Sequence, residues 1–203
     1  MTVDRAYFDA MYAVCDDPWG FRTRWYERRK RAVSMAAMPH ERYACAFEPG
    51  CSIGLLTREL SFRCDQVLAW EGAFEAASRT REELADAGNV RVVWARVPEK
   101  WPEGEFDLVV LSELLYYFDD QDLATVLDLA RGSLRPGGTL LAVHWRHPVA
   151  EHTRSGDDAH RALAELPRLG RLVEHREEDF LLDVYQAGRC ARPASVARAG
   201  GLV

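Results

Sequence analysis

The sequence has no apolar run long enough to cross a bilayer. Its longest apolar stretch, residues 106–118, is interrupted by an aspartate, a serine and a glutamate, so it falls well short of the ~18 uninterrupted residues that a membrane helix needs. The first eight residues carry Asp4 and Arg5 and lack the apolar segment of a secretory signal. These absences predict a cytoplasmic protein with no membrane partner.

Cysteine is scarce and scattered, and basic residues are outnumbered by acids. No C-x-x-C pair and no histidine-rich segment is present, so neither a disulfide framework nor a metal site is indicated; we expect reduced thiols at Cys15, Cys45, Cys51, Cys64 and Cys190. The 26 lysines and arginines against 32 acids give a net charge of −6, which argues against nucleic acid as a partner. Residues 22–31 are a local exception, with six basic residues against Glu27 alone. Such a run is typical of a solvated helix face or of a patch for an anionic group.

What the sequence does contain is the composition of one globular domain. Its 203 residues are 48% hydrophobic and 29% charged, which is enough apolar material for a core. We expect a single domain over residues 1–186, in which residues 1–40 form an N-terminal helical cap on a core of residues 41–186. Residues 187–203 hold several glycines and little periodicity, and they predict a flexible tail.

Helix and strand patterns alternate along this core. Two helices come first, at residues 4–14 and at residues 23–38 with a Thr23 cap. The next helices are predicted at residues 55–61, 73–87 and 120–134. Strands are predicted before and between them at residues 43–47, 66–70, 90–95, 106–111 and 139–145. This alternation predicts a mostly parallel, doubly wound sheet with right-handed crossovers.

Two features complete the predicted architecture. Residues 96–105 are too few for a good crossover helix, so a loop is expected there. After a helix at 158–166, strands at 169–176 and 179–186 follow each other closely enough to form an antiparallel hairpin. The fold class is therefore α/β, a Rossmann-like sheet of seven strands that is mostly parallel, with a C-terminal antiparallel hairpin and N-terminal helices.

The stretch E-P-G-C-S-I-G, residues 48–54, follows the first core strand and enters a helix. This is where an open parallel sheet binds nucleotide-like ligands, and glycines there let the main chain approach the ligand closely. The G-x-G-x-x-G fingerprint of dinucleotide sites is missing. Instead, Glu48 ends the strand, where it can hold a cationic amino group, and Glu71 ends the next strand, where it can accept both hydroxyls of a ribose.

These residues, with the fourth strand F-D-L-V-V-L-S-E, resemble the class I S-adenosylmethionine-dependent methyltransferases over residues 42–143. The resemblance implies S-adenosylmethionine as the cofactor. Ser52 stands where the family has its middle glycine, and Arg96 and Val97 stand where it often has an adenine-contacting aspartate. The expected cofactor-binding residues are Glu48, Gly50, Cys51, Ser52, Gly54, Glu71, Gly72, Arg96, Val97 and Ser112.

A narrower resemblance covers residues 16–160. The sequence contains the motifs D-P-W-G-F, W-Y-E-R-R-K, E-P-G-C-S-I-G-L-L-T, F-D-L-V-V-L-S-E-L-L-Y-Y, V-H-W-R-H-P and G-D-D-A-H. Together they look like the nodulation protein S-like (NodS-like) branch, whose namesakes N-methylate an amino sugar on a chitin-type oligosaccharide. The resemblance implies an N-methyltransferase with a small-molecule acceptor, an amino sugar or another amine.

The remaining candidates surround the expected methyl end of the cofactor. Glu113 and His144 lie at the ends of adjacent strands, and both residue types accept protons at working pH, so they are the candidate catalytic bases. Glu113 could alternatively orient the amine without taking its proton. The candidate acceptor-binding residues are Trp19, Tyr26, Tyr116, Tyr117, Arg146 and His160, although Tyr117 would also suit a core position and the G-D-D run before His160 would also suit a helix cap.

Two other functions fit the same fold. A nicotinamide-dependent oxidoreductase is disfavoured by Glu48 and by the missing third fingerprint glycine. A non-catalytic cofactor-binding protein would keep the same glycines and acids. The acceptor stays open among an amino sugar, a small amine, a hydroxyl and a carboxylate, and the oligomeric state is open as well.

Overall fold

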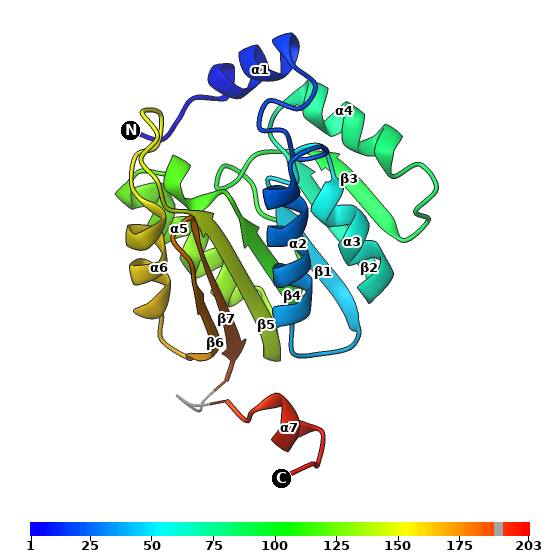
Figure 1. Ribbon diagram of the computed structural model, residues 1–203, viewed down its shortest axis with the longest axis vertical. Coiled ribbons are helices and arrows are strands. Elements are labelled where there is room, and N and C mark those ends of the chain that lie inside the picture. Colours follow the sequence, from blue (N-terminus) through cyan, green and yellow to red (C-terminus); the bar gives the residue numbers. More distant parts are fainter. Residues whose placement is uncertain (189–192) are drawn as a thin grey trace.

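The computed structural model describes residues 1–188 and 193–203, and its centre is one twisted sheet with helices on both faces (Figure 1). The described strands form a seven-stranded sheet in the order β3-β2-β1-β4-β5-β7-β6. Their bounds are β1 Tyr43–Pro49, β2 Cys64–Glu71, β3 Val90–Trp94, β4 Phe106–Ser112, β5 Leu134–Trp145, β6 Leu169–Arg176 and β7 Phe180–Ala187.

Pairing along the sheet is parallel from β3 through β5, and β7 pairs antiparallel with both β5 and β6. The predicted Rossmann-like sheet with its C-terminal hairpin is therefore confirmed. The strand order reverses between β1 and β4, and ligands bind such sheets at the carboxyl ends of the strands beside that reversal.

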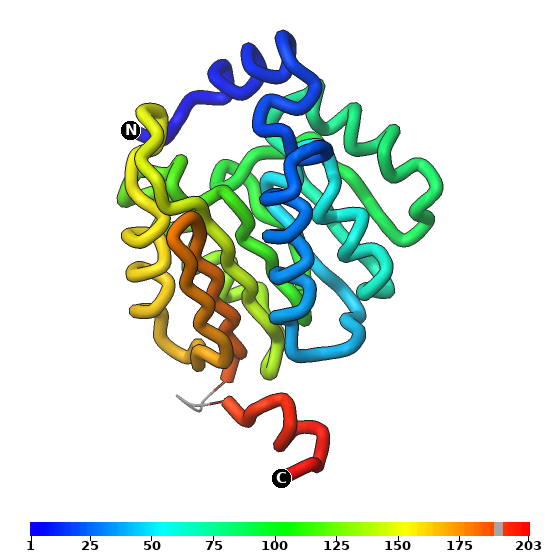
Figure 2. Tube along the Cα trace, in the orientation of Figure 1, coloured from blue at the N-terminus to red at the C-terminus, as the bar shows by residue number. Residues whose placement is uncertain are grey.

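The helices bury both faces of the sheet. Alternate residues of β4 point to opposite sides: Leu108 and Val110 pack with α2 and α3, whereas Val109 and Leu111 pack with α5 and α6. Beyond the strand ends, α1 packs on the loop after β1 and on α4, and the N-terminal segment crosses that edge of the sheet (Figure 2). The helices are α1 Arg5–Val14, α2 Trp25–Ala37, α3 Leu55–Arg63, α4 Phe74–Glu83, α5 Asp120–Gly132, α6 Gly156–Ala164 and α7 Val196–Ala199, and the 3₁₀ turn η1 is Leu115–Tyr117.

Several predicted boundaries are wrong. Strand β5 begins at Leu134 and not at 139, because its pairing with β4 starts at Phe106 and resumes at Leu108 after a register shift. Helix α6 starts two residues early, since Ser155 and Asp158 form a capping box. Helix α2 is preceded by Arg24 rather than capped by Thr23.

The C-terminal segment and the cysteines were also subjects of prediction. The described part of residues 187–203 contains the short helix α7, capped by Ser195, where only a flexible tail was predicted. Residues 189–192, and with them the predicted thiol at Cys190, lie outside the described residues. Free thiols are found at Cys15, Cys45, Cys51 and Cys64.

Among the residues that the structure describes, no helix is long and apolar enough to span a membrane, and no group of three or more histidines, cysteines and acids could hold a metal ion.

Gly54 precedes α3 in a left-handed conformation that packs this helix tightly against α4. Its φ is +80°, and a Cβ there would lie 2.8 Å from Thr80 Cγ2. We expect Gly54→Ala to lower the free energy of unfolding by about 1–3 kcal/mol, because a non-glycine residue in this region is strained. Gly132, which ends α5 with open space around it, provides the control: Gly132→Ala should not destabilise the fold. Chemical denaturation of both variants measures this, and equal stabilities would contradict it.

Candidate active site

A cavity of about 400 Å³ lies beyond the carboxyl ends of β1, β2 and β4, beneath α1 and the start of α2. The end of β1 and the loop after it supply its floor, and aromatic side chains of the N-terminal helices and of η1 supply much of its wall. The structure brings together most predicted site residues here, namely Trp19, Tyr26, Glu48, Gly50, Cys51, Ser52, Glu71, Gly72, Arg96, Val97, Ser112, Glu113, Tyr116 and Tyr117.

The loop after β1 is held against the neighbouring strand. The amides of Gly50 and Cys51 both donate to the carbonyl of Trp70, at 2.7 and 3.0 Å. Gly50 has a φ of +73°, and a Cβ there would lie 3.1 Å from Leu114 Cδ1. A glycine at this position therefore lets β1 turn sharply and lets the loop approach the end of β4 closely.

Glu48 is a buried carboxyl group with few polar contacts to offset the cost of its burial. Thr57 donates to its Oε2 at 2.6 Å, and among residues 1–188 and 193–203 no cation pairs with it. Burial raises the pKa of Glu48 to about 8. A carboxyl group of this kind on the floor of a cavity suits a ligand that brings its own positive charge.

Glu71 lines the same cavity from the end of the adjacent strand. Its Oε2 accepts from the Ser52 amide at 2.8 Å, and its Oε1 accepts from the Ala73 amide at 2.9 Å. Burial raises its pKa above the ordinary value, although these two amides act in the opposite direction. Glu71 thus fixes the glycine loop and lines the cavity, and its carboxylate keeps acceptor positions beyond these two bonds, as recognition of vicinal hydroxyls requires.

The region where the adenine contacts were expected also lines the cavity, through Arg96 and Val97, and Gly72 lies beside it. The Arg96 guanidinium donates to the carbonyl of Val3 at 2.7 Å, and the amide of Val3 donates to the carbonyl of Tyr117 at 2.9 Å. The N-terminal segment therefore bridges two walls of the cavity, a role that local sequence patterns do not show.

Glu113 follows β4 in a left-handed conformation, with a φ of +50°. Its Oε1 lies 2.6 Å from Lys30 Nζ, and its Oε2 accepts from the Tyr116 hydroxyl at 2.5 Å and from the Trp145 amide at 2.9 Å. Strained backbone of this kind persists where surrounding contacts hold it in place. The carboxylate of Glu113 is therefore fixed on three sides.

Lys30 is a site residue that the sequence analysis missed. It is only 5% exposed, and its ammonium also pairs with Glu27 at 3.1 Å. Burial alone would lower the pKa of Lys30, but Glu113 and Glu27 raise it above the ordinary value, so the group stays charged. The basic run 22–31 was interpreted either as a solvated helix face or as a patch for an anionic group, and the first interpretation does not hold for Lys30. Only the packing of α2 beside the end of β4 reveals this.

Aromatic rings surround Glu113. Tyr26 packs edge to face on Trp145, with ring centroids 5.5 Å apart, and Tyr116 stacks on His152 at 3.8 Å. Tyr117 packs edge to face on the same histidine at 5.0 Å. All five rings line the cavity, so Tyr117 is not solely a core residue, and this wall suits a flat or cationic group.

Four predicted site residues do not line the cavity. Gly54 packs against Thr80, as described above. Arg146 forms a two-pronged ion pair with Asp157, at 3.0 Å for each contact. His144 and His160 are buried, and each uses both ring nitrogens in hydrogen bonds. The structure therefore does not bring these four to the cavity wall with the other predicted residues, and His144 is not placed to take a proton from an acceptor in the cavity.

The family of the protein follows from a match across most of its length. The family model for nodulation protein S (NodS) matches residues 10–168. The chain belongs to the nodulation protein S family. The predicted NodS-like branch of the class I S-adenosylmethionine-dependent methyltransferases is thereby confirmed, and the protein is an enzyme of the methyltransferase class.

Individual members and structures agree with this. The nodulation protein S of Rhizobium tropici is 30% identical over 182 residues, which cover 83% of this chain and 75% of that protein. A crystal structure from Pseudomonas syringae, of a protein assigned to the methyltransferases, is 47% identical with a TM-score of 0.72 and covers 80% of this chain and 99% of its own. N-methyltransferase NodS from Bradyrhizobium japonicum WM9, in complex with S-adenosyl-l-homocysteine, shares the fold at 21% identity, with a TM-score of 0.78 over 90% of this chain and 97% of its own.

The raised pKa of Glu48 makes a testable prediction for this NodS-family protein. At pH 6.5 Glu48 holds a proton, and the α-amino group of S-adenosylhomocysteine, whose pKa lies well above that pH, is also protonated. A cation placed beside Glu48 favours its ionised form, so binding should release about one proton and strengthen as the pH rises toward 8. Calorimetry in two buffers of different ionisation enthalpy counts the protons. Equal release by wild type and Glu48→Gln would contradict this role.

Proposed function

We propose that this protein transfers the methyl group of S-adenosylmethionine to the nitrogen of a small amine, with an amino sugar as the acceptor class. The observation that carries the proposal is that carboxyl groups at the ends of three strands, Glu48, Glu71 and Glu113, line one cavity. Family membership supports methyl transfer, and the Bradyrhizobium relative is an N-methyltransferase.

The residues of the cavity fit this cofactor by their chemistry. Glu48 offers a carboxylate to the cationic amino group, and Glu71 offers two oxygens to the ribose hydroxyls. When bound, S-adenosylmethionine supplies an electrophilic methyl group on a positively charged sulfur. The two acids and the glycine loop hold their ligand in one orientation, and positioning of this kind can contribute ~7–11 kcal/mol to a reaction between two bound partners.

Glu113 is the residue we assign to the acceptor. An alkyl amine with a pKa near the 10.4 of lysine arrives protonated, so its nitrogen must lose a proton before it can attack. A carboxylate offers about four acceptor positions, and Lys30, Tyr116 and the Trp145 amide use three of them. The remaining position can accept an N–H of the amine, orient it, and receive its proton.

Lys30 and the aromatic wall support this role. The ion pair with Lys30 at 2.6 Å holds the Glu113 carboxylate in place at the wall of the cavity. The rings of Tyr26, Tyr116 and Tyr117 line the cavity together with Glu113. An amine held there meets one carboxylate and several π faces, both of which attract a cation.

The test is release of S-adenosylhomocysteine from S-adenosylmethionine with matched acceptors. Glucosamine and a simple alkyl amine present a free amine, N-acetylglucosamine has that amine blocked, and glucose has a hydroxyl in its place. We expect turnover with the free amines and none with the other two. Turnover with glucose but not glucosamine would overturn nitrogen as the acceptor atom, and binding of NADH without binding of S-adenosylhomocysteine would overturn the methyltransferase assignment.

A further inference from the structure

A buried polar chain lies behind the aromatic wall, outside the cavity. It consists of His144 at the end of β5, His160 on α6 and Asp183 on β7, which are 0%, 3% and 2% exposed. Three polar side chains are costly to bury where apolar ones would pack. The V-H-W-R-H-P and G-D-D-A-H motifs contain two of the three residues, and the proposed chemistry uses neither.

The hydrogen bonds among His144, His160 and Asp183 are consistent with only one placement of the ring protons. The Leu115 amide donates to His144 Nε2 at 3.2 Å, so the proton of the neutral His144 ring sits on Nδ1. His144 Nδ1 then donates to His160 Nε2 at 3.0 Å. The proton of His160 must therefore sit on Nδ1, which donates to Asp183 Oδ2 at 2.6 Å. By accepting the proton of His160, Asp183 fixes the tautomer of both rings. It thereby leaves Nε2 of His144 free to accept from the Leu115 amide.

The Leu115 amide needs such an acceptor. It begins the 3₁₀ turn η1, whose first amides have no partner within the turn. Leu115 is fully buried, so an unpaired amide there would be costly. His144 therefore caps η1, the turn that carries Tyr116 and Tyr117 and begins two residues after Glu113.

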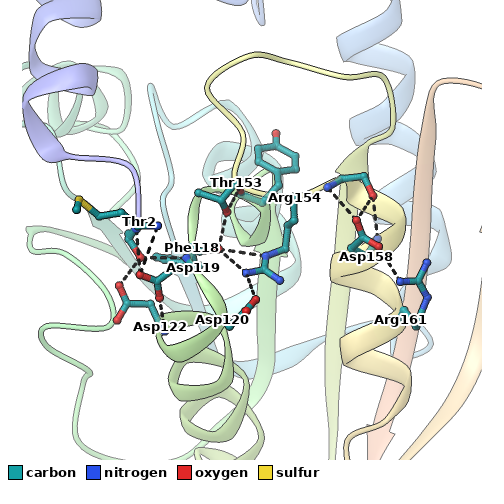
Figure 3. A network of polar contacts seen from close by, with 12 residues as sticks. Thr2, Phe118, Asp119, Asp120, Asp122, Thr153, Arg154, Asp158 and Arg161 are labelled. Carbon is teal, nitrogen blue, oxygen red and sulfur yellow. Dashed lines mark hydrogen bonds and ion pairs between the residues drawn. The ribbon is translucent and has the colours of Figure 1, made fainter.

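The other end of η1 is held independently. The hydroxyl of Thr153 lies within hydrogen-bonding distance of the carbonyls of Tyr116 and Phe118, at 2.9 and 2.6 Å, and shares its one proton between them. Arg154 donates to the Phe118 carbonyl at 2.8 Å (Figure 3). Thr2 accepts from the Asp119 amide at 3.0 Å. With its C-terminal end fixed in this way, the orientation of η1 toward the cavity depends on the cap at Leu115.

We infer that His144 is a positioning residue for the acceptor, and that His160 and Asp183 hold it in the required tautomer. The cap on Leu115 places Glu113, Tyr116 and Tyr117 against the amine. This inference rests on the proposed function, since it assigns those three residues to the acceptor. Burial lowers the pKa of His144 well below its ordinary value, with the neighbouring His160 acting in the same direction, so the ring stays neutral and able to accept.

The experiment compares His144→Gln with His144→Met. The two side chains have nearly the same length, but only glutamine offers an oxygen that can accept from Leu115. We expect both variants to bind S-adenosylhomocysteine like the wild type. With a saturating cofactor, His144→Met should lower kcat/KM for the amine by roughly fivefold to tenfold, as expected for one lost hydrogen bond, and His144→Gln should restore most of it. Equal losses in the two variants would overturn the inference.

Hydrogen exchange of the Leu115 amide provides a readout that needs no turnover. Exchange should be faster in His144→Met than in the wild type and in His144→Gln. The pair His160→Gln and His160→Met repeats the comparison one step farther from the turn if the first pair folds poorly. If no amine is methylated but this exchange pattern appears, the cap is supported and the proposed acceptor fails. Unchanged exchange in both methionine variants would overturn the cap.

Discussion

Replacing Glu71 with alanine is expected to weaken binding of S-adenosylhomocysteine by at least roughly 100-fold, because two hydrogen bonds to a charged group at ~1.5–3 kcal/mol each are lost. The same change removes the acceptor for the Ser52 and Ala73 amides, so the glycine loop also loses its attachment. Isothermal titration calorimetry measures the affinity directly.

Glu75→Ala is the matched control for this loss. Glu75 lies four residues farther along the chain, in the first turn of α4, and its side chain is exposed and does not line the cavity. It carries the same charge, so a general electrostatic effect on a negatively charged protein would appear in both variants. If Glu71→Ala binds S-adenosylhomocysteine as tightly as Glu75→Ala does, Glu71 does not hold the ribose.

Glu113→Gln is expected to keep cofactor affinity and to lower kcat tenfold or more, the scale of a lost general base. The amide has nearly the same shape and can still accept a hydrogen bond, but it cannot receive the proton that the amine must lose. Steady-state kinetics with a saturating amine, together with the Kd for S-adenosylhomocysteine, separates the two effects.

Glu27→Gln distinguishes the loss of a proton acceptor at Glu113 from the loss of one ion pair to Lys30. Glu27 also pairs with Lys30, but Glu113 alone accepts from Tyr116 and from the Trp145 amide. We expect the loss of kcat in Glu27→Gln to be clearly smaller. Unchanged turnover in Glu113→Gln, or an equal loss in Glu27→Gln, would remove Glu113 from the reaction.

The fold could be predicted because local patterns determine most of it. Apolar runs separated by turn residues mark the parallel strands, and E-P-G-C-S-I-G marks the turn whose Gly50 needs a positive φ. The start of β5 could not be predicted, because the Arg-Pro-Gly-Gly stretch reads as a turn. Only its pairing across the register shift with β4 makes it part of a strand.

Some residues of the site could likewise be predicted from the sequence, and others could not. Glu48 and Glu71 lie at the carboxyl ends of neighbouring strands, so the parallel sheet brings them together and sequence position was sufficient. Lys30 was missed because its partner Glu113 is 83 residues away. His144 was placed in the cavity because it ends β5, where side chains alternate between faces; the structure turns it toward α6 and β7, while the next residue, Trp145, lines the cavity.

A crystal structure of the protein with S-adenosylhomocysteine bound tests the central claim most directly. The account predicts the amino group of the ligand within hydrogen-bonding distance of the Glu48 carboxylate and its ribose hydroxyls on Glu71, with the sulfur facing Glu113. A ligand seated elsewhere in the molecule, or seated in this cavity with its ribose away from Glu71, would contradict it.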